Sequence, residues 1–132
     1  MTDTDLTGKV VYVSGPVTTT DTEYAEARTW LRQHGTAHVT TVNRLVDDSL
    51  DDDQKLRERI HELTKRDYDA KDGGLVRRPW YDLVVLLDGW NTSRESDVEC
   101  STALACGIAV IELAELRFMA VVEMGELRGD GR

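Results

Sequence analysis

Long hydrophobic runs are missing from this chain. No apolar stretch approaches the roughly 20 residues that a helix needs to span a bilayer. Residues 1–9 are polar and acidic and lack the basic-then-apolar order of a signal peptide. We therefore expect a cytoplasmic protein with no membrane partner.

Positive charge is also scarce. Lys and Arg number 16 against 25 Asp and Glu, which gives a formal charge of −9. A protein that binds the phosphate backbone needs clustered cations, so we expect no nucleic-acid partner. An acidic protein could instead mimic DNA, and five aspartates crowd residues 47–53. Acids at such positions are also typical of a helix start, where they oppose the positive end of the helix dipole.

Cysteine and phosphate-loop motifs are nearly absent. The two cysteines, Cys100 and Cys106, have a spacing that fits neither a zinc site nor a disulfide framework. The chain has no G-x-G-x-x-G and no Walker pattern, which disfavours the common dinucleotide and triphosphate sites. We expect no metal and no organic cofactor.

What the chain does have is an alternation of strand and helix patterns. Short apolar runs predict strands at residues 10–14, 37–42, 83–87 and 108–111, and helical spacing predicts helices from residue 20, over 49–66 and from Ser93 or Ser96 to Cys106. Residues 67–79 read as a loop, and 113–127 as a helix or a strand. This alternation predicts one α/β domain over residues 1–132, a Rossmann-like (flavodoxin-like) three-layer sandwich with a mainly parallel sheet of four to five strands.

The strand ends indicate where a ligand would bind. In open parallel sheets, ligands lie beyond the carboxyl ends of the strands, which selects residues 14–21 and 88–96 here. Gly15 would let the backbone approach a ligand closely, and the helix starts that follow each loop offer free N–H groups to an anion.

Several chemically useful side chains gather near the second loop. Glu99 falls in the first turn or so of the helix that follows it, and Trp90 could stack on a base. Each also has an ordinary structural explanation: a helix-start glutamate, a packed tryptophan, a capping Ser93 and strand-flanking Asp82 and Asp88. Their convergence on one strand end favours a nucleotide-type site.

Three segments carry a resemblance: VYVSGPVT, YDLVVLLDGW and SRESDVECSTALACGIAVI. They resemble the nucleoside 2-deoxyribosyltransferase superfamily, most closely a branch of small domains frequent in phages. That branch has a Y-x-x-G-P start and a G-W-x-x-S-x-x-x-x-x-E signature. The similarity spans about residues 9–112, and the motifs fall on Tyr12, Gly15, Pro16, Gly89, Trp90, Ser93 and Glu99.

The resemblance implies a chemistry. Members exchange the bases of deoxynucleosides or hydrolyse 2′-deoxynucleoside 5′-phosphates, with a glutamate attacking C1′ of the sugar. Glu99 would be that nucleophile, because a carboxylate can capture oxocarbenium-like charge covalently. A second acid would protonate the departing base. The family places it in a helix upstream of the central strand, which favours Asp67 and leaves Asp69 and Asp72 open.

The resemblance also implies a pocket. Ser93 would hold a 5′-phosphate or the sugar, but Glu95 replaces the glycine of the phosphate-recognising branch and would repel phosphate unless Arg94 offsets it. Asn43 falls where relatives place another pocket residue. The remaining substrate-binding positions are Tyr12, Ser14, Gly15, Pro16, Asp88, Gly89 and Trp90.

Two functions stay open at this point. The first is an enzyme that cleaves or exchanges the N-glycosidic bond of a nucleoside or its 5′-monophosphate. The second is a non-catalytic module that binds or sequesters a nucleotide, and a DNA mimic is a third reading that rests on net charge alone. The expected partners are a small-molecule nucleoside or nucleotide and a second copy of the chain, as a homodimer or larger assembly in which a neighbour closes the pocket. A phage product would act in the host cytoplasm.

Overall fold

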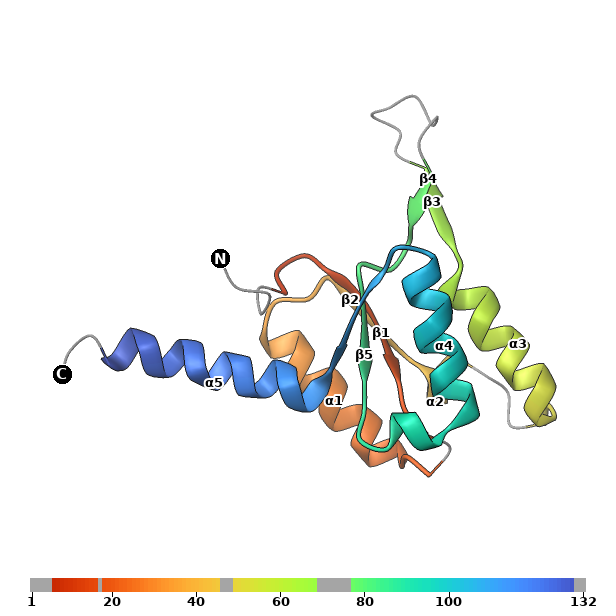
Figure 1. Ribbon diagram of the computed structural model, residues 1–132, viewed down its shortest axis with the longest axis horizontal. Coiled ribbons are helices and arrows are strands. Elements are labelled where there is room, and N and C mark those ends of the chain that lie inside the picture. The colour runs from red at the N-terminus through yellow and green to blue at the C-terminus, as the bar shows by residue number, and fades with distance from the viewer. Residues whose placement is uncertain (1–5, 17, 46–48, 69–76, 130–132) are drawn as a thin grey trace.

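A four-stranded parallel sheet forms the centre of the protein (Figure 1). The computed structural model describes residues 6–16, 18–45, 49–68 and 77–129. The sheet has the strand order β2-β1-β5-β6. Its members are β1 (Val10–Ser14), β2 (His38–Thr41), β5 (Leu83–Leu86) and β6 (Ala109–Glu112). This confirms the predicted α/β Rossmann-like architecture.

Helices cover both faces of this sheet. They are α1 (Asp21–Gln33), α2 (Val42–Leu45), α3 (Asp52–Leu63), α4 (Arg94–Ala105) and α5 (Leu113–Gly129), with a short 3-10 turn, η2 (Trp90–Thr92), before α4. Figure 1 shows α1 and α5 on one side of the sheet and α3 and α4 on the other. Parallel strands need such crossover helices. The central strands β1 and β5 are buried almost throughout, whereas the edge strands β2 and β6 are partly exposed.

Alternate side chains of β1 face the two helix layers, one formed by α3 and α4 and the other by α1 and α5. Side chains alternate across a strand, and Tyr12 and Ser14 contact residues of α3 and α4. Val11 and Val13 therefore face the layer of α1 and α5, and all four side chains are buried. The α3–α4 side of β1 thus carries two hydroxyl groups where a core strand usually carries alkyl groups.

The predicted start of the first helix is confirmed, whereas the helix predicted over residues 49–66 is shorter, because Asp51 caps its start and the helix ends at Leu63. Thr20 caps α1 by accepting a hydrogen bond from the Glu23 amide at 3.1 Å. Asp51 and Gln54 form a capping box at the start of α3, with Asp52 and Asp53 in its first turn. This part of the acidic cluster is a helix start, whereas Asp47 and Asp48 lie outside the described residues.

The loop predicted for residues 67–79 is wrong at both ends. Residues Arg66–Tyr68 (β3) and Arg77–Pro79 (β4) form a two-stranded antiparallel ribbon, and the Trp80 amide donates to the Lys65 carbonyl at 2.9 Å. Figure 1 shows the ribbon projecting away from the main sheet. These strands are three residues long and mostly polar, so backbone pairing forms them without the apolar alternation that reveals a strand in a sequence.

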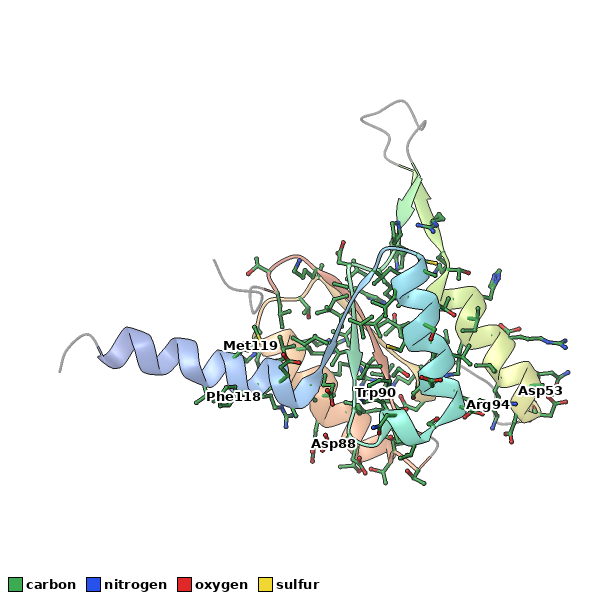
Figure 2. The ribbon with its side chains drawn as sticks, viewed as in Figure 1. Asp53, Asp88, Trp90, Arg94, Phe118 and Met119 are labelled. Atoms are coloured by element: carbon green, nitrogen blue, oxygen red, sulfur yellow. The ribbon has the colours of Figure 1, made fainter. Side chains whose placement is uncertain are left out.

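Helix α5 settles the ambiguous C-terminal segment as helical. Leu113 and Leu116 are buried, but Phe118 is 68% and Val121 66% exposed. Figure 1 shows the helix continuing past the sheet, and Figure 2 shows Phe118 on this helix. Within the described residues, no helix has both the length and the apolar character needed to cross a bilayer.

Candidate functional site

Glu99 is buried at the interface of α4 and the sheet. It lies six residues after Ser93, the N-cap of α4, and so in the second turn of the helix rather than the first. Its side chain is 0% exposed. A carboxylate in such a position must find hydrogen-bond donors or a counter-ion within the protein, because burial without them costs several kcal/mol.

Two hydroxyl groups of β1 supply donors to this carboxylate. The Tyr12 hydroxyl donates to Glu99 Oε2, and the Ser14 hydroxyl donates to Oε1 at 2.8 Å. Ser14 Oγ also lies 3.0 Å from Ser96 Oγ, one turn before Glu99 on α4. Strand β1 and helix α4 are thus joined by a polar network just before the Ser14-Gly15 turn.

Arg59 of α3 supplies the counter-ion. Its Nη2 forms an ion pair with Glu99 Oε1, and the two side chains are 7% and 0% exposed. The same nitrogen lies 3.5 Å from Ser14 Oγ, and the Arg59 carbonyl lies 3.4 Å from the Tyr12 hydroxyl. Among the described residues, the buried Nε of Arg59 has no hydrogen-bond partner.

The electrostatics of the network follow from burial and from the two charges. Burial raises the pKa of Tyr12 well above its usual value, and the charge of Glu99 and the hydrogen bond to it raise it further. For Arg59, burial lowers the pKa, but the charge of Glu99 and the hydrogen bond to it outweigh burial, so the net shift is upward. Tyr12 therefore remains a proton donor, and Arg59 remains a cation.

Arg59 is the functional candidate that the sequence reasoning missed. The predicted apolar face of this helix consisted of Leu56, Ile60 and Leu63, yet Arg59 and Leu63 are its buried residues. Because positions 56, 59, 60 and 63 share one helical face, an arginine within an otherwise apolar stripe was the available signal.

The two loops predicted to form the site do meet. A Cβ added to Gly89 would lie 3.4 Å from Pro16 Cγ, so the second loop rests against the first. A Cβ added to Gly15 would lie 2.6 Å from Thr19 Oγ1, and the Gly15 carbonyl accepts from the Tyr24 hydroxyl at 3.3 Å. Only glycine fits this turn without a shift of its neighbours.

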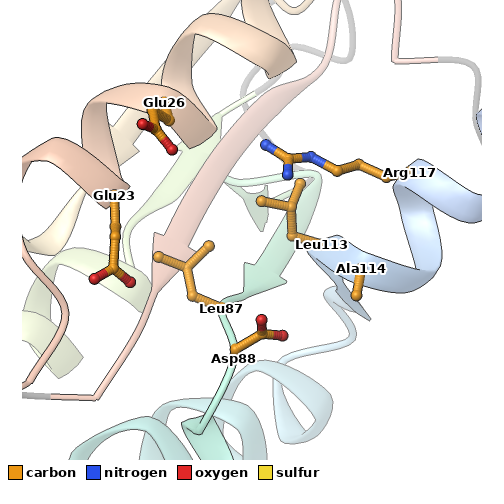
Figure 3. Close-up of a pocket in the computed structure, with 7 residues that line it drawn as sticks. All are labelled: Glu23, Glu26, Leu87, Asp88, Leu113, Ala114 and Arg117. Atoms are coloured by element: carbon orange, nitrogen blue, oxygen red, sulfur yellow. The ribbon is translucent and has the colours of Figure 1, made fainter.

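Asp88 lines a hollow that does not include Glu99. The hollow is open, has a volume of about 200 Å³ and lies beside α1 and α5 (Figure 3). The residues that line this hollow are Glu23, Glu26, Leu87, Asp88, Leu113, Ala114 and Arg117. Glu99 is not among them, so the structure separates Asp88 from the carboxylate with which the sequence grouped it.

The start of α4 is held by polar contacts. Ser93 caps the helix, accepting from the Ser96 amide at 3.4 Å, and its hydroxyl lies 3.2 Å from Glu95 Oε2. Arg94 pairs with Glu95 at 3.5 Å and with Asp53 of α3 at 3.2 Å (Figure 2). Arg94 thus offsets the charge of Glu95, as expected, while also bridging α4 to α3.

Trp90 and Asn43 keep their places near the carboxyl ends of the strands. Trp90 is half-buried on η2 and packs against the core. Asn43 lies within α2 rather than at the end of β2, and it donates to Asp21 at 3.0 Å. Its Oδ1 is buried with no hydrogen-bond partner in the described part of the chain.

Two aspartates lie away from the strand end at which the sequence reasoning brought the site residues together. Asp82 flanks β5 as predicted, but at the start of that strand. Asp82 accepts a 2.8 Å hydrogen bond from the Val10 amide at the beginning of β1, the end of the strand remote from Ser14. Asp67 lies on β3, opposite Arg78, and not in a helix. The ribbon follows α3 and precedes β5, which places it at the amino-terminal end of the sheet (Figure 1). Asp69 and Asp72 lie outside the described residues.

Comparisons with known proteins add no identification. No protein-family model matches the chain, and no curated protein or solved structure gives a significant match. In the part of the chain that the structure describes, no group of three His, Cys, Asp or Glu side chains could hold a metal ion. The fold and the Tyr12–Ser14–Arg59–Glu99 network are therefore the observations on which a functional proposal rests.

Proposed function

We propose that this protein cleaves or exchanges the N-glycosidic bond of a nucleoside or nucleoside 5′-monophosphate, with Glu99 as the nucleophile. The observation that supports this is the Glu99 carboxylate, held by the Tyr12 and Ser14 hydroxyl groups beside the turn that ends β1. This is the end of a parallel sheet where ligands bind. The motif resemblance assigns the same role to the same residue.

The proposed reaction has two steps. A Glu99 oxygen bonds to C1′ while the C1′–N bond breaks, and the departing base takes that electron pair and a proton from solvent water. Water or a second base then bonds to C1′ and gives up a proton to solvent, while the bond from C1′ to Glu99 breaks and Glu99 leaves as a carboxylate. Tyr12 holds Oε2 by hydrogen bond throughout and directs Oε1 at the sugar. Asp67 is not part of this proposal, because its strand lies at the other end of the sheet.

Access to Glu99 requires a rearrangement. In the structure both carboxylate oxygens are engaged, Oε1 by Arg59 and Ser14 and Oε2 by Tyr12. A sugar carbon can reach Oε1 only after Arg59 has moved from it. Motion of α3 relative to α4 would provide this, since the exposed Arg94–Asp53 pair that joins the helix starts contributes little energy.

The experiment is a base-release assay. The protein is incubated with a panel of deoxynucleosides, ribonucleosides and their monophosphates, and free base or exchanged nucleoside is measured by chromatography. Glu99→Gln should abolish release, whereas Asp97→Asn, an exposed acid on the same helix, should not. Release that survives Glu99→Gln would remove Glu99 from the mechanism.

A second candidate function is a nucleotide-binding module without turnover. The complete burial of Glu99 and its pairing with Arg59 favour it, because such a pair also serves a purely structural role in a protein core. Calorimetry would then detect nucleotide binding while the chromatographic assay finds no product. Any catalysis that depends on Glu99 would exclude this function.

We also propose that the protein is a homodimer or a larger homo-oligomer. The exposed Phe118 and Val121 on the projecting α5 support this, since a solitary helix gains little stability in water without a packed face. A second copy that packs along α5 would cover these side chains and border the hollow that α5 shares with α1.

A further inference from the structure

Arg59 has more hydrogen-bonding capacity than the protein uses. A guanidinium carries five N–H donors in a rigid plane. The side-chain contacts of Arg59 described above all come from Nη2, and its buried Nε has no partner among the described residues. Buried donors are seldom left unpaired, so an unpaired one at a candidate site calls for an explanation.

The geometry of the unpaired donor is informative. In arginine, Nε and Nη2 share one edge of the guanidinium plane, and this edge binds two oxygens of a phosphate or carboxylate in parallel. Glu99 contacts Nη2 through Oε1 and leaves Nε without a partner. The edge would be fully satisfied by an anion that presents one oxygen to each nitrogen.

Freeing Glu99 for chemistry raises a charge problem. If Arg59 leaves Glu99 with no replacement, a buried cation and a buried carboxylate both lose their counter-ion, which strongly disfavours the reactive state. A ligand that brings its own anion removes half of this penalty, because the guanidinium exchanges one anionic partner for another. A neutral nucleoside offers no such exchange.

We propose that Arg59 is the anion receptor of this site: a phosphate group on the ligand takes the Nε–Nη2 edge and so releases Glu99 Oε1. The inference rests on the proposed function and narrows it, since the ligand is then a phosphorylated nucleoside rather than a nucleoside. The exchange makes and breaks no covalent bond. Arg59 acts as a binding residue for the phosphate and as a positioning residue for Glu99.

The surroundings of Ser93 disfavour a phosphate there and so favour a phosphate at Arg59. The carboxylate of Glu95 lies 3.2 Å from the Ser93 hydroxyl and 3.5 Å from Arg94. A phosphate at Ser93 would meet that carboxylate, and Arg94 is already shared between Glu95 and Asp53. Arg59, by contrast, lies beside Ser14 and has a donor, Nε, without a partner among the described residues.

The first test uses orthophosphate alone, titrated against the full chain in a calorimeter at constant ionic strength. Glu99→Gln leaves Arg59 without a counter-ion, so this variant should bind phosphate about tenfold to a hundredfold more tightly than the unmodified protein. The double variant Arg59→Met/Glu99→Gln should lose the gain, and Arg59→Lys/Glu99→Gln, which keeps the charge but not the two-donor edge, should lose most of it.

A matched control tests whether the gain in phosphate affinity depends on Arg59 itself. Arg57→Met removes an exposed arginine from the same helix and should leave phosphate binding unchanged. Equal phosphate affinity in the unmodified protein, Glu99→Gln and Arg59→Met/Glu99→Gln would overturn the inference. If Arg59→Met/Glu99→Gln does not fold, the phosphate affinity of Arg59→Lys/Glu99→Gln is compared with that of Glu99→Gln instead.

The second test separates this inference from the proposed function. Each deoxynucleoside is compared with its 5′-monophosphate in the base-release assay, and the monophosphate should have the higher kcat/KM by at least about tenfold. Equal rates for both would overturn the role of Arg59 and leave the N-glycosidase proposal standing. If no substrate releases base but phosphate still binds through Arg59, the enzyme proposal fails and the receptor inference survives.

Discussion

Arg59 and Glu99, 40 residues apart in the chain, meet as a buried ion pair between α3 and α4. The pair is joined to β1 through Tyr12 and Ser14, so three segments converge on one carboxylate. In the free protein this arrangement holds Glu99 in a fixed position and shields it from solvent. The same contacts that orient the carboxylate therefore also have to open before it can react.

Removing Arg59 should destabilise the protein strongly. Arg59→Leu leaves a buried carboxylate without its counter-ion, and we expect the free energy of unfolding to fall by about 3–5 kcal/mol. Urea denaturation followed by circular dichroism measures this. The double variant Arg59→Leu/Glu99→Leu should recover most of the loss, whereas exposed Arg57→Leu should change it by about 0.5 kcal/mol or less. A loss below about 1 kcal/mol for Arg59→Leu would contradict a buried pair.

Tyr12→Phe should weaken both stability and catalysis. The variant loses a hydrogen bond to a charged group, which is worth about 1.5–3 kcal/mol. Tyr24→Phe, which loses contacts with neutral groups alone, the Gly15 carbonyl at 3.3 Å and the Thr19 side chain, should cost less. A double-mutant cycle of Tyr12→Phe with Glu99→Gln tests the contact directly, and additive effects would show that the two residues are uncoupled.

The protein should lose stability in strong alkali. Burial raises the pKa of Tyr24 from 10.0 to about 12, and burial together with a carboxylate raises the pKa of Tyr12 and of Tyr81. A raised folded-state pKa means that the stabilisation is complete below the unfolded pKa near 10 and is lost as the pH rises through the folded pKa. The melting temperature should therefore fall between about pH 10 and 12.

Tyrosinate absorbance provides the control for this pH effect. The buried Tyr12, Tyr24 and Tyr81 should titrate together with unfolding. Tyr24→Phe should flatten the loss of stability over the same pH range. A melting temperature that stays constant to pH 12 would contradict the raised pKa of Tyr24.

Gly15→Ala should destabilise the turn after β1. The new Cβ would lie 2.6 Å from Thr19 Oγ1 and 3.2 Å from Leu87 Cδ1, so its neighbours must move, at a cost of about 1–3 kcal/mol. Thermal unfolding measures the change. Adding Thr19→Ala removes the closest contact and should restore part of the loss. No rescue would place the strain elsewhere in the turn.

The oligomer proposal predicts that charged substitutions on α5 lower the mass of the assembly. The unmodified protein should elute as a dimer or larger species in size-exclusion chromatography with light scattering. Phe118→Glu/Val121→Glu puts charge on the exposed face and should give monomers without loss of folding, because neither side chain is buried. Leu104→Glu, an exposed apolar residue on α4, is the matched control. A monomeric unmodified protein would refute the proposal.

The sequence predicted the parts of the fold that local patterns determine. The run at 10–14 matches β1 residue for residue, because a strand buried on both faces is continuously apolar. Ser93 and Thr20 marked helix starts through their capping chemistry. Glu99 was found from motif spacing, and its burial agrees with a role inside the protein.

Other features depend on tertiary pairing. The apolar stripe of α3 indicates that Arg59 faces the core, but its ion-pair partner could not be predicted, since Glu99 is 40 residues away in the chain. The β3–β4 ribbon depends on cross-strand hydrogen bonds between short polar segments. Asp88 and Glu99 both follow β5 in the chain. Asp88 lines the hollow beside α1 and α5, whereas Glu99 is a buried residue of α4.

The two ends of the β3–β4 ribbon lie next to each other in space, because the Trp80 amide donates a hydrogen bond to the Lys65 carbonyl. The chain between them can therefore grow or shrink without displacing the helix before it or the strand after it. Length variation among homologous sequences is easily tolerated at such a point. An alignment that places its gap between residues 68 and 77 leaves both α3, which carries Arg59, and α4, which carries Glu99, intact.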